Sequence, residues 1–522
     1  MSSEGRIRVG VSLEGRRVAR WKRDVLLGLH ETDGIELALV VLTSAERSPD
    51  RGATGALLRL YRAIDRRVFA AAPDPLARVD AGPLLEGVPT VDHRDGQAAG
   101  PPAGAPLDVA LALGAESDPL LSAARHGVWT YRHGVGRERR DDVPYLRDIR
   151  EGRLASHVAL VRQSDRAVLA SSTVRTDLVS LHRVRRAALL RCRHLAGRCL
   201  SELRDGVEVV AELEEPEVTR VHSGGPSVGT LLGIIVRIAA RLAQHRIRNA
   251  LWHEQWSFVV RPPEGAPPPV SFAGARQHRP PRGRDWADPF PFRSEDRSWL
   301  FFEEVAWRGG HGHISVGELD DAGALHDVRV ALATDHHLSY PFVFAHQGET
   351  YLLPEARASS ATTLYRARSF PDQWEPVCTL ADMPLYDPTL VEHDGCWWLF
   401  GTHAEPGESQ DDELHLFHAD ALGGPWHAHP RNPVVSDVRG ARPAGPIIRD
   451  DGRLVRPAQD CSGRYGRAVV FKEVLELSRT RYREVEVARL EPDWLARNLA
   501  THHYATDERW AATDALRRRR RW

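Results

Sequence analysis

Cysteine is scarce in this chain, and its spacing does not suggest a disulfide framework or a zinc site. The 522 residues include five cysteines, an odd number, and no two of them form a Cys-x-x-Cys motif. They are Cys192, Cys199, Cys378, Cys396 and Cys461. This pattern excludes the disulfide-rich secreted class and favours a reducing compartment. We expect no metal centre.

Long apolar runs are also missing. The most apolar stretch, residues 228–242, is interrupted by Arg237 and Arg241 and is too short to cross a bilayer. No signal-type apolar segment precedes Leu13, because the chain moves directly into a strand pattern. We therefore expect a cytoplasmic protein that touches a membrane at most peripherally.

Neither sign of charge is in excess. Lys and Arg number 70 against 71 Asp and Glu, which excludes a general affinity for nucleic acid. The exception is the run Arg517 to Arg521 before Trp522. Such a run is typical of a solvated, disordered tail, and otherwise of a contact for anionic lipid or phosphate. Glycine-rich phosphate loops, kinase motifs, serine elbows and dinucleotide fingerprints are missing too, so no cofactor is expected.

What the second half does contain is a repeat. Four times, a short strand that opens on proline runs through a polar turn into an aromatic-rich or apolar strand. The four prolines are Pro289, Pro341, Pro388 and Pro446, at successive spacings of 52, 47 and 58 residues. A period near 50 with hairpin patterning is typical of a β-propeller, each copy being one blade. Residues 247–260 and the late strand near residues 502–513 are predicted to close a fifth, composite blade.

Blade geometry gives the repeat a chemical meaning. The innermost strands surround one channel, so Asp288, Ser339 or Tyr340, Asp387 and Ala444 should face a shared cavity. Two carboxylates from different blades would allow acid/base chemistry. The alternative is structural, because proline tolerates the first strand position and Asp favours turns.

A chain of 522 residues is expected to form roughly two to four domains. The first 200 residues show a different pattern of secondary structure from the repeat. Strand patterns at residues 7–13, 35–42, 107–114 and 127–131 alternate with helical patterns such as 18–30 and 56–69. This alternation predicts a doubly wound, mostly parallel α/β sheet. We place this domain at residues 1–205, a helical connector at 206–247, the propeller at 248–514 and a basic tail at 515–522.

Several segments of the second half resemble the propeller of the glucosamine inositolphosphorylceramide transferase family. They are residues 287–292, 338–344, 387–390, 412–417, 442–445 and 456–462. The resemblance covers roughly residues 248–510 and implies a five-bladed, sugar-directed domain. The plant members of that family carry a separate glycosyltransferase domain, which this chain does not match.

This propeller is similar in turn to that of certain glycoside hydrolases. There, an Asp on the first inner strand is the general base, a later Asp tunes the proton donor, and the donor is a Glu. The resemblance implies Asp288 as base and Asp387 as the tuning residue. For the donor, the fourth blade offers Arg442, Arg456 and Asp460 instead, and the substitutes are Glu303, Glu304 and Glu355. Arginines in a pocket suit a phosphate or carboxylate, so the two arginines are predicted to hold an anionic group.

The first half resembles the formyltransferase fold of enzymes that use a folate donor. His133 matches the family's histidine and Asp165 its aspartate, while Tyr131 stands where the family has an oxyanion-binding Asn. The Ser-Leu-Leu-Pro run after the histidine is replaced by residues 135–138. The resemblance therefore implies the fold, with His133 and Asp165 as candidates for acyl transfer, but not folate-dependent formyl transfer.

Histidines and tryptophans supply further candidates. His336 and His337 precede an inner strand and are predicted to contact substrate, whereas His311 and His313 suit a surface better than a metal site, because no third ligand is placed by spacing. Trp256, Trp286 and Trp426 could stack on a sugar or fill the core.

Three functions remain open. The first is an enzyme of glycoconjugate or polysaccharide assembly that acts on a sugar, sugar phosphate or sugar nucleotide in the propeller, with Tyr340, Glu355 and Asp460 among the substrate contacts. The second is acyl transfer to an amino sugar by the first domain. The third is a glycan-binding propeller without catalysis.

Overall fold

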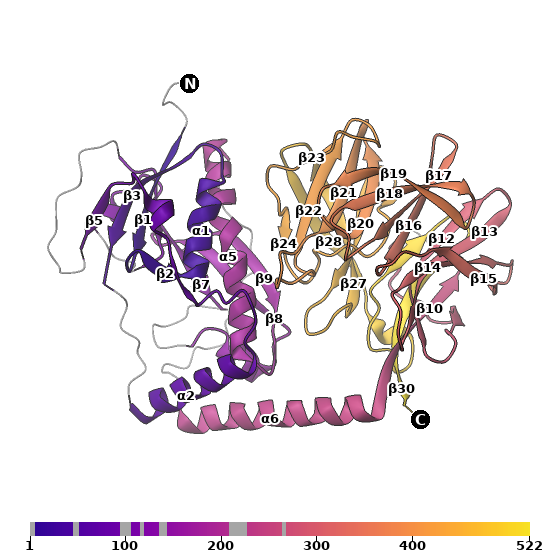
Figure 1. The fold of residues 1–522 in the computed structure, drawn as a ribbon, viewed down its shortest axis with the longest axis horizontal. Helices are drawn as coiled ribbons and strands as arrows, with labels where there is room; N and C mark the ends of the chain where they lie inside the picture. Colours follow the sequence, from indigo (N-terminus) through magenta and orange to yellow (C-terminus); the bar gives the residue numbers. More distant parts are fainter. Residues whose placement is uncertain are drawn as a thin grey trace. The chain divides into compact units, whose positions relative to one another are not determined.

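The chain forms two compact units (Figure 1). The computed structural model describes residues 6–44, 52–93, 106–114, 119–134, 143–207, 227–263 and 268–521. The first unit comprises Met1–Ala243 with Pro406–Glu408, and the second Gln244–Glu405 with Ser409–Trp522. The boundary near residue 244 falls inside the connector expected at 206–247, of which residues 208–226 lie outside the described part.

A mostly parallel sheet organises the first unit, as the strand and helix alternation predicts. Its strand order is β5-β3-β1-β6-β7-β8-β9, with the first five strands parallel and the last two antiparallel. The strands are β1 (Ile7–Leu13), β3 (Ile35–Leu42), β5 (Thr90–Asp92), β6 (Val109–Ala112), β7 (Val128–His133), β8 (Ala155–Arg162) and β9 (Val168–Arg175). A small pair, β2 (Arg17–Ala19) and β4 (Arg78–Asp80), stands apart.

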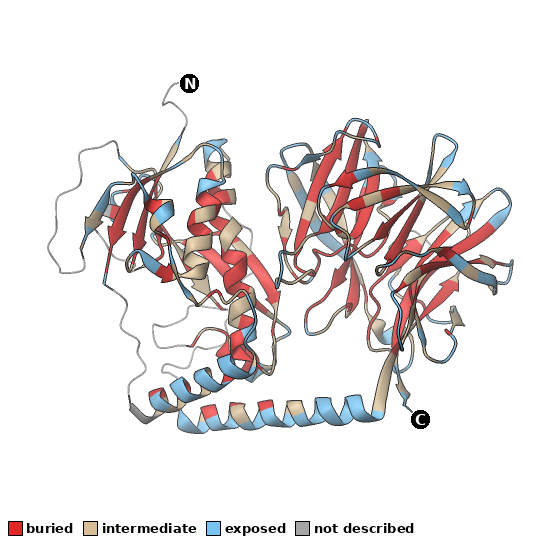
Figure 2. Ribbon diagram, in the orientation of Figure 1, coloured by how far each residue is buried: buried red, intermediate tan, exposed pale blue. Residues whose placement is uncertain are grey.

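Helices cover this sheet because their apolar side chains recur on one face. They are α1 (Arg20–His30), α2 (Gly52–Val68), α3 (Pro119–Ser122), α4 (Leu146–Glu151) and α5 (Leu181–Arg204), with the short 3₁₀ turn η1 (Gly82–Leu85). Buried residues of α1 and α5, such as Leu26 and Leu195, join the strand residues Val9, Val11 and Leu111 in one core. Figure 2 shows the buried strands and the buried stripe of α5.

Helix α6 (Val228–Leu251) extends into the segment predicted to begin the closing strand at residue 247. The strand begins only at Trp252, because the helix continues through Leu251. Of the helices within the described ranges, none is long and apolar enough to span a membrane.

The second unit is a five-bladed propeller. Its blades are separate antiparallel sheets, and each predicted hairpin lies on its own blade. Blade one is β12 (Arg284–Ser294), β13 (Arg297–Ala306), β14 (His313–Leu319) and β15 (Leu325–Leu332). Blade two is β16 (Ser339–His346), β17 (Glu349–Glu355), β18 (Thr362–Ser369) and β19 (Gln373–Ala381).

The remaining blades follow the same plan. Blade three is β20 (Tyr386–His393), β21 (Cys396–Thr402), β22 (Glu413–Ala419), β23 (His427–Ala428) and β24 (Val435–Ser436). Blade four is β25 (Ile448–Asp450), β26 (Arg453–Asp460), β27 (Ala468–Leu477) and β28 (Tyr482–Leu490), followed by the 3₁₀ turn η2 (Pro492–Trp494). Blade five, in the order β11-β10-β30-β29, is β11 (Arg276–His278), β10 (Trp252–Arg261), β30 (Ala511–Arg520) and β29 (Tyr504–Thr506).

The residue before each blade proline has an unusual backbone. Asp288, Tyr340 and Asp387 have φ of 49°, 47° and 48°, and Gly445 takes the corresponding place before Pro446 with φ 140°. At each of the three non-glycine positions the strand register shifts, which marks a bulge. Such a φ costs a non-glycine residue about 1 to 3 kcal/mol and is typical of functional sites.

Blade five closes the propeller as predicted, by pairing β10 with the late strand β30. The arginine run does not form the disordered tail that its composition suggests. Trp252, Glu254 and Gln255 pair with Arg520, Arg518 and Arg517 across the ladder, so most of the run belongs to β30. Ladder hydrogen bonds hold these arginines in place, which composition alone could not reveal.

Candidate active site

Asp288 lies at the start of the first blade beside the closing strand. Its Oδ2 accepts a hydrogen bond from the backbone N–H of Tyr340 (3.1 Å). Its Oδ1 lies 3.1 Å from Nε2 of His502, whose Nδ1 lies 2.7 Å from Oδ2 of Asp514. All three side chains are buried. A histidine thus bridges two carboxylates from different blades.

This bridge sets the charge of Asp288. Burial by itself would raise the pKa of Asp288, but His502, His503 and Arg442 outweigh it and lower the pKa to about 2. Burial opposes the charged form of His502, whose pKa Asp514 and Asp288 nevertheless raise well above its usual value. Asp288 is therefore a carboxylate and His502 an imidazolium at neutral pH.

His503 differs from its neighbour. Its Nδ1 lies 3.8 Å from Asp288, and burial lowers its pKa to about 4 despite the nearby carboxylates. One neutral and one charged imidazole therefore border Asp288.

Glu303 is the second carboxyl of this region. Strand pairing sets it opposite Ala287, the residue before Asp288. Its Oε1 lies 2.9 Å from Nε2 of His337, and the two side chains keep 14% and 36% of their surface exposed. The Nδ1 of His337 accepts the backbone N–H of Gly312 (3.0 Å), which orients the ring. This pair is the part of the cluster that solvent reaches.

Glu303 holds its proton more tightly than an ordinary carboxyl. Burial raises its pKa to about 7, assisted by the charges of Asp288 and Glu355 and opposed by His337. The hydrogen bond to Glu303 in turn raises the pKa of His337. A half-buried carboxyl with a pKa near neutrality can serve as a general acid.

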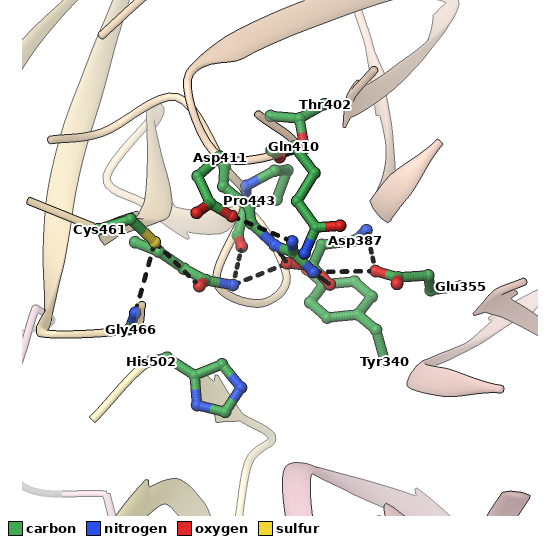
Figure 3. A network of polar contacts seen from close by, with 12 residues as sticks. Tyr340, Glu355, Asp387, Thr402, Gln410, Asp411, Pro443, Cys461, Gly466 and His502 are labelled. Carbon is green, nitrogen blue, oxygen red and sulfur yellow. Dashed lines mark hydrogen bonds and ion pairs between the residues drawn. The ribbon is translucent and has the colours of Figure 1, made fainter. Parts of the chain in front are cut away.

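Arg442 gathers three carboxylates around its guanidinium. Figure 3 shows the three residues that supply them, Glu355, Asp387 and Asp411. It donates from Nε to Asp387 (2.6 Å), from Nη2 to Glu355 (3.1 Å) and from Nη1 to Asp411 (3.3 Å). Burial raises the pKa of Asp387 well above its usual value, although Arg442 lowers it. The predicted role of Arg442 in holding a substrate anion does not fit this arrangement, because protein carboxylates already surround it.

Asp387, Tyr340 and Glu355 are likewise held by hydrogen bonds within the protein. Asp387 also accepts from Nε2 of Gln459 (2.7 Å), and its backbone N–H donates to Glu355 (3.0 Å). The hydroxyl of Tyr340 lies 2.7 Å from Thr389 Oγ1, and the ring is fully buried. Tyr340 and Glu355 therefore position Asp288 and Asp387 rather than line an open surface.

Two predicted contacts of the fourth blade lie in separate ion pairs. Arg456 is fully buried and donates from Nε and Nη2 to Glu484 (2.9 and 2.7 Å), and further to backbone carbonyls. Asp460 binds Arg467 (2.9 Å) and Arg489 (2.6 Å). Substrate contact is not supported for either, because both side chains are satisfied within blade four.

The remaining predicted contacts divide between surface and core. His336 faces Asp335 at 2.8 Å at the surface. Trp286 packs in the core against Phe258, with ring centroids 5.5 Å apart. Trp426 packs against a blade core too. Trp256 lies over His502, with ring centroids 4.2 Å apart, and is the tryptophan nearest the acid/base cluster among the three candidates.

The candidates in the first unit are not brought together. His133 ends β7, whereas Asp165 follows Arg162, which pairs with Trp129 at the other end of β7. Trp129 and His133 are four residue steps apart along the strand, roughly 13 Å. Asp165 is exposed and bound to Arg162. The hairpin direction, which sequence matching did not specify, explains the failure of this predicted pair.

The side chains of His133 and Tyr131 are also engaged in contacts within the protein. Burial lowers the pKa of His133 to about 4, and its Nδ1 lies 3.0 Å from the hydroxyl of Tyr145. Tyr131 donates its hydroxyl to the backbone carbonyl of Cys192 (2.8 Å) and is not available to stabilise an oxyanion. Residues 135–138, which replace the family's Ser-Leu-Leu-Pro run, lie outside the described residues.

Sequence reasoning missed five members of the site, namely His502, His503, Asp514, Asp411 and Gln459. The signal for the first two was present, because this His-His pair opens the late strand predicted to close the propeller. Asp514 and Gln459 have no local signal, since their place in the site depends on blade packing. Among the described residues, Asp288, His502 and Asp514 could together hold a metal ion, with ligand atoms within 4.8 Å of one another.

Sequence comparison links the propeller to a transferase family. Residues 268–499 match the family model described as glucosamine inositolphosphorylceramide transferase 1, N-terminal. The protein of that name from Oryza sativa subsp. japonica is 39% identical over 205 residues, which cover 38% of this chain and 28% of the rice protein. The Arabidopsis thaliana protein is 37% identical over 205 residues, 38% of this chain and 27% of its own. The chain thus matches less than a third of these relatives' length.

Solved structures give weaker matches. Zg3597, a family 117 glycoside hydrolase of Zobellia galactanivorans, is 12% identical with a TM-score of 0.34, over 50% of this chain and 90% of its own. CoXyl43, a β-xylosidase/α-arabinofuranosidase from a compost metagenome, is 13% identical with a TM-score of 0.33, over 45% of this chain and 90% of its own.

Proposed function

We propose that this chain is a sugar-directed, transferase-like enzyme of glycoconjugate or glycosylated-metabolite assembly, with its acid/base site in the propeller. One observation carries the proposal: Asp288 and Glu303 come from paired strands, and their surroundings separate their pKa values to about 2 and about 7. Such separation gives one site a base and an acid at neutral pH. The names of the sequence relatives support sugar transfer as the chemistry.

The two carboxyls have complementary tasks. Glu303 gives its proton to the leaving oxygen as the bond between that oxygen and the anomeric carbon breaks. Asp288 takes the proton of the acceptor hydroxyl while the oxygen of that hydroxyl forms the new bond to the anomeric carbon. When the acceptor is a hydroxyl group of another sugar, the reaction is transfer. When the acceptor is water, it is hydrolysis.

The neighbouring side chains hold these two groups in their working states. His502, fixed by Asp514, keeps Asp288 ionised, and His337 orients Glu303. Asp387 and Arg442 form the rigid, buried support behind them. Asp387 thus acts as a positioning residue.

A propeller that binds carbohydrate without catalysis is the second candidate. The observation that favours it is the depth of Asp288, whose side chain keeps 6% of its surface exposed. A substrate hydroxyl would have to enter the cluster to reach it. Binding of a glycan without any product would identify this function.

We further propose that the first unit has a formyltransferase-like shape without folate-dependent formyl transfer. The strand order and the parallel pairing of its first five strands support the shape. The engaged hydroxyl of Tyr131 and the separation of His133 from Asp165 argue against acyl transfer.

The test is a mass-spectrometric screen for products with sugar nucleotides and sugar phosphates as donors and glycans, inositol phosphates and amino sugars as acceptors. Asp288→Asn and Glu303→Gln should each lower turnover about 100-fold or more. Glu318→Gln, on the same blade but paired with Arg297 at the surface, is the matched control and should keep turnover. Full turnover in Asp288→Asn would contradict the proposal.

A further inference from the structure

The arginine run of β30 forms one wall of a cavity in the second unit. The cavity has a volume of about 660 Å³, within the usual range for small-molecule sites. It lies on blade five and the segment after η2. Its lining residues are Trp252, Gln255, Ser257, Gln277, Arg279, Arg497, Leu499, Arg517, Arg518 and Arg519. Half of them are arginines, and none is acidic.

Strand pairing explains how the arginines come to line it. Gln255 pairs with Arg517 and His253 with Arg519, so these two arginines share a face of the sheet with Gln255 and Ser257. Gln255 and Ser257 are buried and form a polar floor, while Arg517 and Arg519 are half-buried above it. The guanidinium groups are therefore held by regular secondary structure.

The positive charge of the lining arginines is not neutralised by carboxylates of the lining. The carboxylate of Glu254 approaches Arg518 at 3.4 Å, but it also binds Arg464 at 2.8 Å. Over the described ranges of the chain, no carboxylate pairs with Arg517 or Arg519. Burial and the charges of Arg279 and Arg517 lower the pKa of Arg519, as expected where cations crowd together.

Nearby donors are free to turn toward a ligand. Arg279 is exposed and donates only to the amide oxygen of Gln277 (3.1 and 2.9 Å). Arg497 is exposed on the segment after η2 and also lines the cavity. Guanidinium groups bind phosphate oxygens in pairs, and several of them suit a ligand with more than one phosphate group.

We propose that this cavity binds the diphosphate group of an organic ligand, with Arg517 and Arg519 as its principal contacts. A single phosphate would leave most of the positive charge unpaired, whereas a diphosphate carries about three negative charges and matches it. Trp252 adds an aromatic wall for the organic part of the ligand. A soluble nucleoside diphosphate and a lipid that carries a diphosphate headgroup share this chemistry.

The test measures binding to the full chain by calorimetry with pyrophosphate and ADP, and by co-sedimentation with vesicles of phosphatidylcholine with or without a prenyl diphosphate. The double variant Arg517→Gln/Arg519→Gln should weaken binding at least about tenfold, the loss expected for two charge-assisted contacts. Arg481→Gln/Arg483→Gln is the control, because it removes the same charge from exposed sites of blade four. It should bind as the wild type does.

The two arms separate the sources of the ligand. Binding of pyrophosphate and ADP that the cavity variant weakens indicates a soluble diphosphate, and cavity-dependent binding of vesicles alone indicates a lipid headgroup. Equal weakening in the control variant, or no binding in either arm, overturns the proposal. Should the β30 variant fail to fold, Arg279→Gln/Arg497→Gln, both outside that strand, makes the same test. Neither set of arginine substitutions changes Asp288 or Glu303. The turnover test of Asp288→Asn and Glu303→Gln is therefore independent of this binding test.

Discussion

The Nε2 atom of His502 lies 3.1 Å from Oδ1 of Asp288, although the two residues stand at opposite ends of the propeller sequence. The contact exists because the last strands of the chain complete the fifth blade beside the first. Closure of the propeller and assembly of its acid/base cluster are thus one event.

Removal of His502 should therefore destabilise the fold. His502→Gln leaves the buried carboxylates Asp288 and Asp514 without their cation, a change that typically costs about 3 to 5 kcal/mol. Denaturant unfolding measures it. His326→Gln, which disrupts only the surface pair with Asp320, is the control and should have a much smaller effect. Equal losses in the two variants would contradict the bridging role.

The stability difference between the wild type and His502→Gln should depend on pH. The folded-state pKa of His502 is raised, so its contribution is complete below the unfolded value of 6.5 and is lost as pH rises through the folded value. The pKa of Asp288 is lowered, so its contribution is present above 3.8 and is lost as pH falls toward about 2. The difference should be largest between these limits. A difference that is constant from pH 3 to 9 would argue against the ion pair.

Arg442 should be irreplaceable by lysine. Arg442→Lys cannot reach Asp387, Glu355 and Asp411 with one ammonium group, so we expect a loss of about 2 to 4 kcal/mol in unfolding free energy. Arg366→Lys, at the surface pair with Glu375, is the matched control and should unfold like the wild type. An Arg442→Lys protein of wild-type stability would show that the three contacts do not act together.

The first unit should not transfer a formyl group. Supplied with a formyl-folate donor and amino-sugar nucleotides, the chain should give no formylated product, because loss of one oxyanion donor costs about 100- to 1000-fold in rate. Tyr131→Phe should lower stability by about 1 kcal/mol through its hydrogen bond to Cys192 and leave sugar-directed turnover unchanged. A formylated product that disappears in His133→Ala would move the active site to this unit.

The sequence predicts the propeller well because proline and aromatic residues mark each hairpin locally. Pro289, Pro341 and Pro388 lie on three different blades, on strands with the predicted partners. The positive φ at Asp288 could not be foreseen, since it results from a bulge in the ladder rather than from residue type. Glu303 was one of three candidates for the proton donor, and its contacts distinguish it from Glu304: Glu303 faces His337, whereas Glu304 binds Arg284 and Ser315.

Other parts of the site depend on contacts that no local pattern encodes. The sequence predicts that Arg442 contacts an anionic substrate. It does not show that three carboxylates from other segments surround this arginine. The arginine run looked like a tail because composition does not report strand pairing. The pairing of His133 with Asp165 failed because the hairpin between β7 and β8 carries Asp165 away.

The most direct test of the central claim is the titration of Glu303 itself. Infrared difference spectra between the wild type and Glu303→Gln isolate the carboxyl stretch of this one residue across a pH series. A protonated carboxyl signal should disappear with a midpoint near pH 7, because burial and the charge of Asp288 raise the pKa of Glu303. A midpoint near 4.5, the value of an ordinary glutamate, would show that Glu303 is already ionised at neutral pH and contradict its role as the acid.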